Sequence, residues 1–289
     1  MSEWRRNISG GLAGAAAALL ALALVTAAAR ADAPLTTLGT ADQSRGWEAV
    51  GRLDFGPDGF CTAALVAAEI VLTAAHCVHD DRTGALLPIG AMRFRPGLRY
   101  GRAEAHRGVR RVVVHPDYHG RGGGDRLDRV GADLALLELD RPVRLGHVRP
   151  FRTRLGIRRG ERVEVVSYAK DRAEAPSLQS SCAVIDRDRD VLVLDCEVDF
   201  GASGAPVFAL TGGEMRIVSV ISAKADLRDR PVALAASVEG EIEPLLRAFA
   251  RTPAAAPVGG RLLAERRPSA RVLERIAGPK VVRPPPRAD

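Results

Sequence analysis

Residues 199–206 form a stretch whose composition suits nucleophilic catalysis. They read Asp-Phe-Gly-Ala-Ser-Gly-Ala-Pro and place Ser203 between glycines. Because glycines allow a sharp turn, such a loop brings a serine hydroxyl and two backbone N–H groups to one point, as acyl transfer requires. The tetrapeptide Gly-x-Ser-Gly is also common in ordinary loops. Ser203 is therefore a candidate nucleophile that needs a base and an orienting acid elsewhere in the chain.

A histidine and an aspartate upstream occur in contexts that suit these two roles. His76 follows the β-rich segments 61–66 and 69–73, in the run Leu-Thr-Ala-Ala-His-Cys-Val. Asp133 opens the apolar run Asp-Leu-Ala-Leu-Leu, and a carboxylate buried there needs a partner. A structural histidine and a strand cap are the alternative interpretations. Because no Cys-x-x-Cys spacing occurs, we expect no metal and no cofactor.

Three separate motifs resemble those of the chymotrypsin-like (trypsin-like) serine proteases. They are the segment 61–77, the run that starts at Asp133, and the Gly-x-Ser-Gly loop, and they follow one another in the order found in that family. The resemblance implies a catalytic triad of His76, Asp133 and Ser203 that works through an acyl-enzyme intermediate. It also implies an oxyanion hole formed by the N–H groups of Gly201 and Ser203.

The resemblance covers roughly residues 46–250 and implies an all-β fold. The expected architecture is two six-stranded antiparallel β-barrels with a C-terminal helix, and the chain does divide into two β-rich halves. The helix is indicated by Ile242, Leu245, Leu246 and Phe249, which fall at helical spacing.

A glycine-rich run at residues 120–124 invites comparison with phosphate-binding loops. It lacks the Gly-Lys-Ser/Thr ending of such loops, and we find no helical pattern after it. We therefore expect a surface loop with no part in chemistry.

The chain has four cysteines, which favour pairing in an exported protein and allow three connectivities. The family resemblance implies a disulfide that braces the loop carrying the histidine. Proximity along the chain favours the pairs Cys61–Cys77 and Cys182–Cys196. The second pair would steady a hairpin that turns at residues 187–190 and leads into the serine loop.

Three residues are candidates for substrate binding. In the resembled family, the strand at Ser222 lines the substrate cleft and this serine approaches the catalytic aspartate. Glu197 lies six residues before Ser203, a position that selects basic side chains in trypsin-like members. Lys224 would instead prefer acidic side chains or neutralise Glu197. Solvated charges at the rim of the cleft are the alternative, so the sequence selects no particular substrate residue.

Two departures from the animal digestive enzymes bear on activation. Those enzymes have an acid directly before the serine, which pairs with a newly cut N-terminus, whereas this chain has Ala202 and no Ile-Val-Gly-Gly start. In this respect the chain resembles the bacterial, glutamyl-endopeptidase-like branch. We predict that activity requires no cleavage-triggered ion pair.

The first residues have the layout of a secretory signal. A basic Trp-Arg-Arg at residues 4–6 precedes an apolar run at 8–29, and small residues follow. We expect a signal peptide at residues 1–31, and an uncleaved membrane anchor is the alternative. Both place the protease domain, residues 32–250, outside the cytoplasm, so the protein is expected to be secreted or periplasmic.

Residues 251–289 carry most of the net charge of the chain. They hold nine Arg or Lys and three Asp or Glu, which accounts for +6 of the total of +7. We expect a disordered tail rich in Arg and Pro that makes electrostatic contact with anionic envelope polymers. The body has no basic stripe interleaved with aromatic residues, which argues against nucleic-acid binding.

The sequence thus predicts an exported, monomeric serine endopeptidase that acts on protein or peptide substrates. Two other functions remain open at this stage. One is a non-catalytic binding protein on the same scaffold, since fold and motif do not guarantee turnover. The other is an envelope-tethered protein whose basic tail is the working part.

Overall fold

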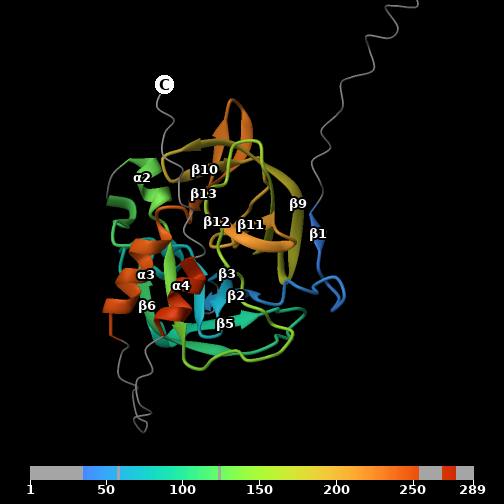
Figure 1. Ribbon diagram of the computed structural model, residues 1–289, viewed down its shortest axis with the longest axis vertical. Helices are drawn as coiled ribbons and strands as arrows, with labels where there is room; N and C mark the ends of the chain where they lie inside the picture. The colour runs from blue at the N-terminus through green and yellow to red at the C-terminus, as the bar shows by residue number, and fades with distance from the viewer. Residues whose placement is uncertain (1–34, 57–58, 123–124, 254–268, 278–289) are drawn as a thin grey trace, which may run out of the picture. The chain divides into compact units, whose positions relative to one another are not determined.

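The structure is a computed structural model that describes residues 35–56, 59–122, 125–253 and 269–277. The predicted signal peptide lies outside the described residues. Within the described part of the chain, no helix combines the length and apolar character that a membrane crossing needs. Strands dominate, and Figure 1 shows them gathered into two groups.

The first group of strands closes into a six-stranded barrel, as the sequence predicted. Neighbouring strands pair antiparallel in the order β2-β3-β4-β7-β6-β5. Leu53, Leu65, Leu72 and Leu136 are fully buried in its core. The strands are β2 (Val50–Phe55), β3 (Phe60–Ala67), β4 (Ile70–Thr73), β5 (Met92–Pro96), β6 (Arg107–Val114) and β7 (Ala135–Leu139).

The second group forms a seven-stranded sheet in the order β1-β9-β10-β13-β12-β11-β8, and a further pairing of β8 with β9 joins six of these strands into a barrel-like ring. The seventh strand, β1, precedes the first barrel in the sequence and pairs antiparallel with β9. The strands are β1 (Thr36–Thr37), β8 (Arg162–Ala169), β9 (Arg172–Asp188), β10 (Val191–Leu194), β11 (Pro206–Thr211), β12 (Glu214–Leu227) and β13 (Arg230–Ser237).

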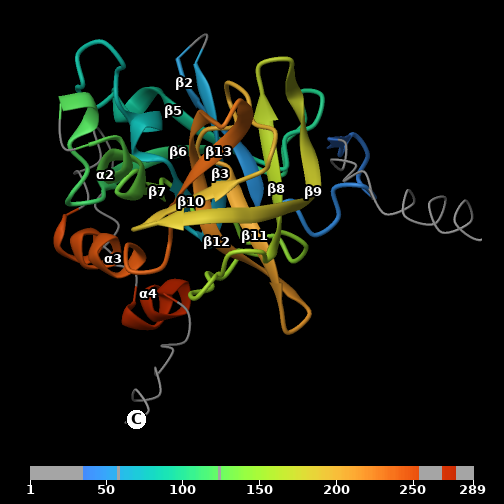
Figure 2. The same cartoon turned by 90° about the horizontal axis from the view of Figure 1, so that it is seen from above.

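The predicted C-terminal helix is confirmed as α3 (Ile242–Arg251), whose apolar stripe packs into the same core as the first barrel. A second helix, α4 (Ala270–Ala277), corrects the expectation that all of residues 251–289 would be disordered. Figures 1 and 2 show α3 and α4 side by side, beside the first group of strands.

Packing contacts hold helix α4 in place. The helix is too short for its apolar spacing to be recognised in the sequence. Val272, Leu273 and Ile276 form one apolar stripe, and Ile276 is completely buried. The hydroxyl of Thr153, in the connection between the two groups of strands, donates a hydrogen bond to the carbonyl of Ile276. The parts of the predicted tail on either side of α4 lie outside the described residues.

The glycine-rich run also differs from expectation, because a helix does follow it. Residues 120–122 form a short 3-10 turn, and α2 (Arg126–Gly131) begins shortly afterwards. Asp125 caps α2 by accepting hydrogen bonds from the N–H groups of Leu127 and Asp128. The Asp-x-x-Asp spacing was the available signal, an acidic variant of the capping box.

Candidate active site

The side chains of His76 and Asp133 meet where the first barrel opens. His76 lies on the 3-10 turn η1 (Ala75–Val78), directly after β4, and Asp133 lies just before β7, which pairs with β4. The two carboxylate oxygens of Asp133 accept from the backbone N–H of His76 (2.8 Å) and contact its Nδ1 (2.6 Å). The histidine is therefore fixed at both its main chain and its ring.

Asp133 is buried, with 3% of its side chain exposed, and it is fully supplied with partners. The Ser222 hydroxyl donates to the carboxylate oxygen that also faces the His76 ring, at 2.5 Å. Burial acts to raise the pKa of Asp133, but the charge and hydrogen bonds of His76, together with the Ser222 hydrogen bond, hold this pKa below its usual range. The carboxylate therefore stays ionised at neutral pH.

An ionised Asp133 sets the tautomer of His76. Because a carboxylate only accepts hydrogen bonds, Nδ1 of the neutral ring must carry the proton, which leaves Nε2 as an acceptor. A third of the His76 side chain is exposed, so the ring is not sealed inside the barrel. This arrangement suits a general base.

Both predicted disulfides are formed, and each braces one half of the site. Cys61–Cys77 ties β3 to the residue after His76. Cys182–Cys196 ties β9 to the segment that leads into the Ser203 loop. The sulfur atoms of the first pair lie near the His76 ring, but disulfide sulfurs offer no thiolate to a metal.

The Ser203 loop is a tight turn wedged between the two barrels. Its backbone folds back through hydrogen bonds from Ala202 N–H to Asp199 and from Gly204 N–H to Ile221, both at 2.8 Å. Thr62 on β3 donates its N–H to the Ser203 carbonyl at 2.9 Å. The loop on the second barrel is thus attached to the strand that carries Cys61 on the first.

Glycine is required at position 204 for space as well as for conformation. Gly204 has a φ of +78°, and a Cβ there would lie 2.1 Å from the Thr73 hydroxyl and 2.3 Å from the Thr62 carbonyl. Thr73 is the last residue of β4, three positions before His76. The close approach therefore brings the residue after Ser203 against the strand end that leads to the histidine.

Thr62 connects the two barrels through its hydroxyl and its carbonyl, and the sequence analysis did not single it out. Its hydroxyl donates to the Gly201 carbonyl and accepts from the Tyr168 N–H, and its carbonyl accepts from the Thr73 hydroxyl, all at 2.9 Å. Thr62 is completely buried. The available signal was a polar residue within an apolar β-strand, which needs a buried partner.

The two predicted oxyanion-hole residues, Gly201 and Ser203, have backbone N–H groups that can donate hydrogen bonds. The Phe200 carbonyl accepts from the Lys170 N–H at 2.8 Å, and in a trans peptide the following N–H, that of Gly201, points the opposite way. In the described part of the chain, the N–H groups of Gly201 and Ser203 have no protein acceptor. Since Lys170 acts only through its backbone, no feature of the sequence could have revealed its contribution.

Two of the candidate substrate-binding residues, Glu197 and Lys224, are charged. Lys224 pairs with Asp199 at 2.7 Å, whereas neutralisation of Glu197 was one of the possibilities that the sequence left open. The hydrogen bond from Lys224 holds the pKa of Asp199 below its usual value. Glu197 is exposed and donates its backbone N–H to the side chain of Gln179. The ion pair therefore links the Ser203 loop to β12, beside the exposed ring of Phe200.

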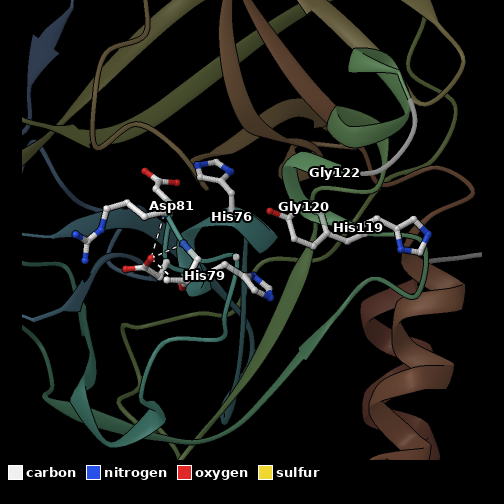
Figure 3. A pocket seen from close by; sticks show the side chains of 11 residues that line it. His76, His79, Asp81, His119, Gly120 and Gly122 are labelled. Carbon is white, nitrogen blue, oxygen red and sulfur yellow. Dashed lines mark hydrogen bonds between the residues drawn. The ribbon is translucent and has the colours of Figure 1, made fainter.

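A pocket of about 540 Å³ opens beside His76. Figure 3 shows His76 between two groups of lining residues, with His79 and Asp81 on one side and His119 and Gly120 on the other. One wall is the loop that follows η1, and the other is the loop that precedes α2. The candidate base thus stands at the edge of this pocket.

Comparison with known proteins identifies the family. The profile of the family described as trypsin-like peptidase domain matches residues 59–215, more than half of the chain. This stretch holds His76, Asp133 and Ser203. The chain belongs to the trypsin-like peptidase family.

Curated relatives share part of this chain at moderate identity. The chain is 38% identical over 96 residues to the modular serine protease of Drosophila melanogaster, covering 30% of this chain and 14% of that protein. It is 31% identical over 173 residues to serine protease 23 of Homo sapiens, covering 51% of this chain and 42% of that protein. The chain spans less than half the length of these relatives.

Solved structures of two proteases share the fold. A Glu endopeptidase superposes with a TM-score of 0.62 at 19% identity, covering 75% of this chain and 97% of that one. A thermostable serine protease from an extremophilic microorganism superposes with a TM-score of 0.53, also at 19% identity, covering 68% and 94%. These likenesses establish the chymotrypsin-like fold.

Proposed function

We propose that the protein is a serine endopeptidase that hydrolyses peptide bonds with His76, Asp133 and Ser203 as its triad. His76 Nε2 takes the proton of the Ser203 hydroxyl while that oxygen bonds to a peptide carbonyl carbon, and it returns the proton to the leaving amine as the C–N bond breaks. Water, activated by the same nitrogen, then releases the acyl group and restores the serine.

The observation that carries the proposal is the buried Asp133 carboxylate. It contacts both the backbone and the Nδ1 of His76 and accepts from Ser222, so the acceptor side of the ring is turned away from the acid. A negative charge kept in a buried position serves to stabilise the imidazolium that forms when His76 takes a proton. A histidine with only a structural role does not require a buried, ionised carboxylate beside its ring.

The donors for the oxyanion support the same assignment. The N–H groups of Gly201 and Ser203 would stabilise the charge that develops on the substrate carbonyl oxygen, and each such donor contributes about 3 kcal/mol in comparable sites. The Lys170 hydrogen bond to the Phe200 carbonyl fixes the peptide that carries the Gly201 N–H before substrate arrives, which supports this role. Such preorganisation costs nothing at the moment of reaction.

Activation and export complete the proposal. Ala202 is completely buried and offers no carboxylate to a new N-terminus, so activity needs no cleavage-triggered ion pair, as in the bacterial glutamyl-endopeptidase-like branch. Two disulfides favour an oxidising compartment, in keeping with a signal peptide at residues 1–31. Protein or peptide chains are the substrates.

A fluorophosphonate probe tests the proposal, because only an activated serine reacts with it quickly. We expect the purified protein to be labelled, Ser203→Ala to remain unlabelled, and His76→Ala to react at least about a hundredfold more slowly. Ser219→Ala removes another buried serine hydroxyl of the second sheet and should be labelled like the parent.

The absence of labelling in a folded parent protein with both disulfides formed would contradict the proposal. It would favour a binding protein on the protease scaffold. Labelling that appears only after trimming upstream of Trp47 would leave the triad intact but would refute the proposed mode of activation.

A further inference from the structure

Strand β12 has an edge beside the Ser203 loop that no described strand covers. On one side, β13 pairs with it from Ser219 to Leu227, whereas on the other side β11 pairs with it only as far as Val220. The Ser203 loop takes over at Ile221 through two backbone hydrogen bonds. Residues 222–227 therefore present an open edge, to which an extended peptide can add as a further strand.

Arg126 already occupies an acceptor on this part of β12. It is the first residue of α2, and its guanidinium donates a hydrogen bond to the Lys224 carbonyl at 2.7 Å. The Arg126 side chain is exposed at this point. A peptide that pairs with β12 through the Lys224 carbonyl must displace Arg126 from it.

Arg126 differs from the charged residues around it in having no acidic partner. Asp125 and Asp128 cap α2 and pair with Arg189. Lys224 also has its own carboxylate partner. Among the described residues, Arg126 takes part in no ion pair, and its hydrogen bond is to a neutral carbonyl. It is thus a cation able to accept a carboxylate from another molecule.

We propose that Arg126 is a specificity-determining residue that selects an acidic side chain on the N-terminal side of the scissile bond; this inference rests on the proposed function. The strands of this sheet pair antiparallel, and a peptide that continues this order runs from Lys224 toward Ser203. Its residues beside Arg126 therefore precede the bond that is cut.

The exchange of partners explains the selectivity. A peptide N–H that takes the Lys224 carbonyl leaves the Arg126 guanidinium without its acceptor. An Asp or Glu side chain of the peptide replaces that acceptor with a charge-assisted hydrogen bond, which is about twice as strong as one to a neutral group. A peptide with Gln in the same place forms only a hydrogen bond between a charged and a neutral group and gains less binding free energy. This difference in binding free energy is the expected preference for Glu over Gln.

The test measures binding and cleavage separately. An array of nonapeptides in matched sets, with Glu, Gln or Lys at one position, is incubated with the Ser203→Ala protein, which cannot consume them. We expect the Glu member to bind about three- to tenfold more tightly. Arg126→Ala on the same background should remove this preference, and Arg126→Glu should turn it into a preference for Lys.

Three further variants and the active protein complete the design. Arg126→Lys keeps the charge without the planar fork and should retain part of the preference. Arg144→Ala removes an equal charge from an exposed position in the connection between the two barrels and should leave the preference unchanged. In the active protein, the same Glu-to-Gln ratio is expected in kcat/KM when the acid lies two to four residues before the cut.

The outcomes separate this inference from the proposed function. A preference for Glu that depends on Arg126, in a protein that cleaves nothing, would support the inference and refute the peptidase. Cleavage with no preference for Glu, or with a preference that survives Arg126→Ala, would refute the inference and leave the peptidase standing. Thermal unfolding of each variant confirms that α2 and the sheet remain folded.

Discussion

Removal of the Ser222 hydroxyl provides the sharpest test of how the Asp133 charge is held. Ser222→Ala deletes one hydrogen bond to a carboxylate that is 3% exposed, and the two contacts with His76 remain. A hydrogen bond to a charged group contributes about 1.5–3 kcal/mol. We therefore expect the unfolding free energy at pH 7 to fall by about 2 kcal/mol, because the lost hydrogen bond no longer helps to hold the pKa of Asp133 below its usual range.

The sign of the pH dependence follows from the direction of the Asp133 shift. Its pKa is lowered in the folded state, so the stability that it contributes is present above the unfolded value of about 3.9 and is lost as pH falls through the folded value. The variant has less of this stability to lose. The difference between parent and variant should therefore be full at pH 7 and shrink below about pH 4.

Urea unfolding of the two proteins at pH 7 and at pH 3 measures this difference, and the chain supplies a matched control. Ser219 lies on the same strand and is completely buried, but its hydroxyl has no hydrogen-bond partner among the described residues. Ser219→Ala should be neutral or stabilising, because it removes an unsatisfied polar group. Equal losses in the two variants, or no loss in Ser222→Ala, would refute the reasoning.

Two further predictions concern the oxyanion loop and helix α3. In Gly201→Ala, the new Cβ would lie 2.4 Å from the Phe60 ring and 3.0 Å from the Ala169 Cα, at a φ of +94°. The loop must therefore shift. We expect fluorophosphonate labelling of this variant to slow by about a hundredfold or more. Unchanged labelling would contradict the assignment of this N–H. Burial, then the charges of Asp190 and Asp117, raise the pKa of Glu241 to about 7. Because ionisation of Glu241 is less favourable in the folded state, the parent should lose stability as pH rises from 5 to 8. The expected loss is about 2 kcal/mol after allowance for partial exposure, and Glu241→Gln should lose less. Thermal unfolding at both pH values checks this, and parallel curves would count against it.

Local motifs made much of the site predictable. His76, Asp133 and Ser203 each lie in a short run with its own character, and the cysteine spacing pointed to the two pairs that the structure forms. The need of a buried carboxylate for a partner was also a sound guide, because Asp133 has two neighbours that supply hydrogen bonds. Such inferences depend on residue type and on nearby residues only.

The remaining features depend on contacts between distant parts of the chain. Lys170 orients Gly201 through its backbone, which any residue except proline provides, so residue type carried no signal. Lys224 pairs with Asp199 rather than Glu197, and this partner depends on how the Ser203 loop folds against β12. Helix α4 has only one completely buried residue, and its stability comes from packing rather than from a periodic pattern long enough to recognise.

The packing of α3 and α4 has a consequence for the order in which the chain is made. Both helices follow the second barrel in sequence, yet Leu245, Phe249 and Ile276 complete the core of the first. When residues 50–139 leave the ribosome, the apolar face that these helices cover is still bare, and Ser203 has not been added. A growing chain at that length therefore holds His76 and Asp133 without Ser203, in a barrel that still lacks its cover. The proposed triad and the cover of the first barrel are completed only after both barrels and the helices have been synthesised.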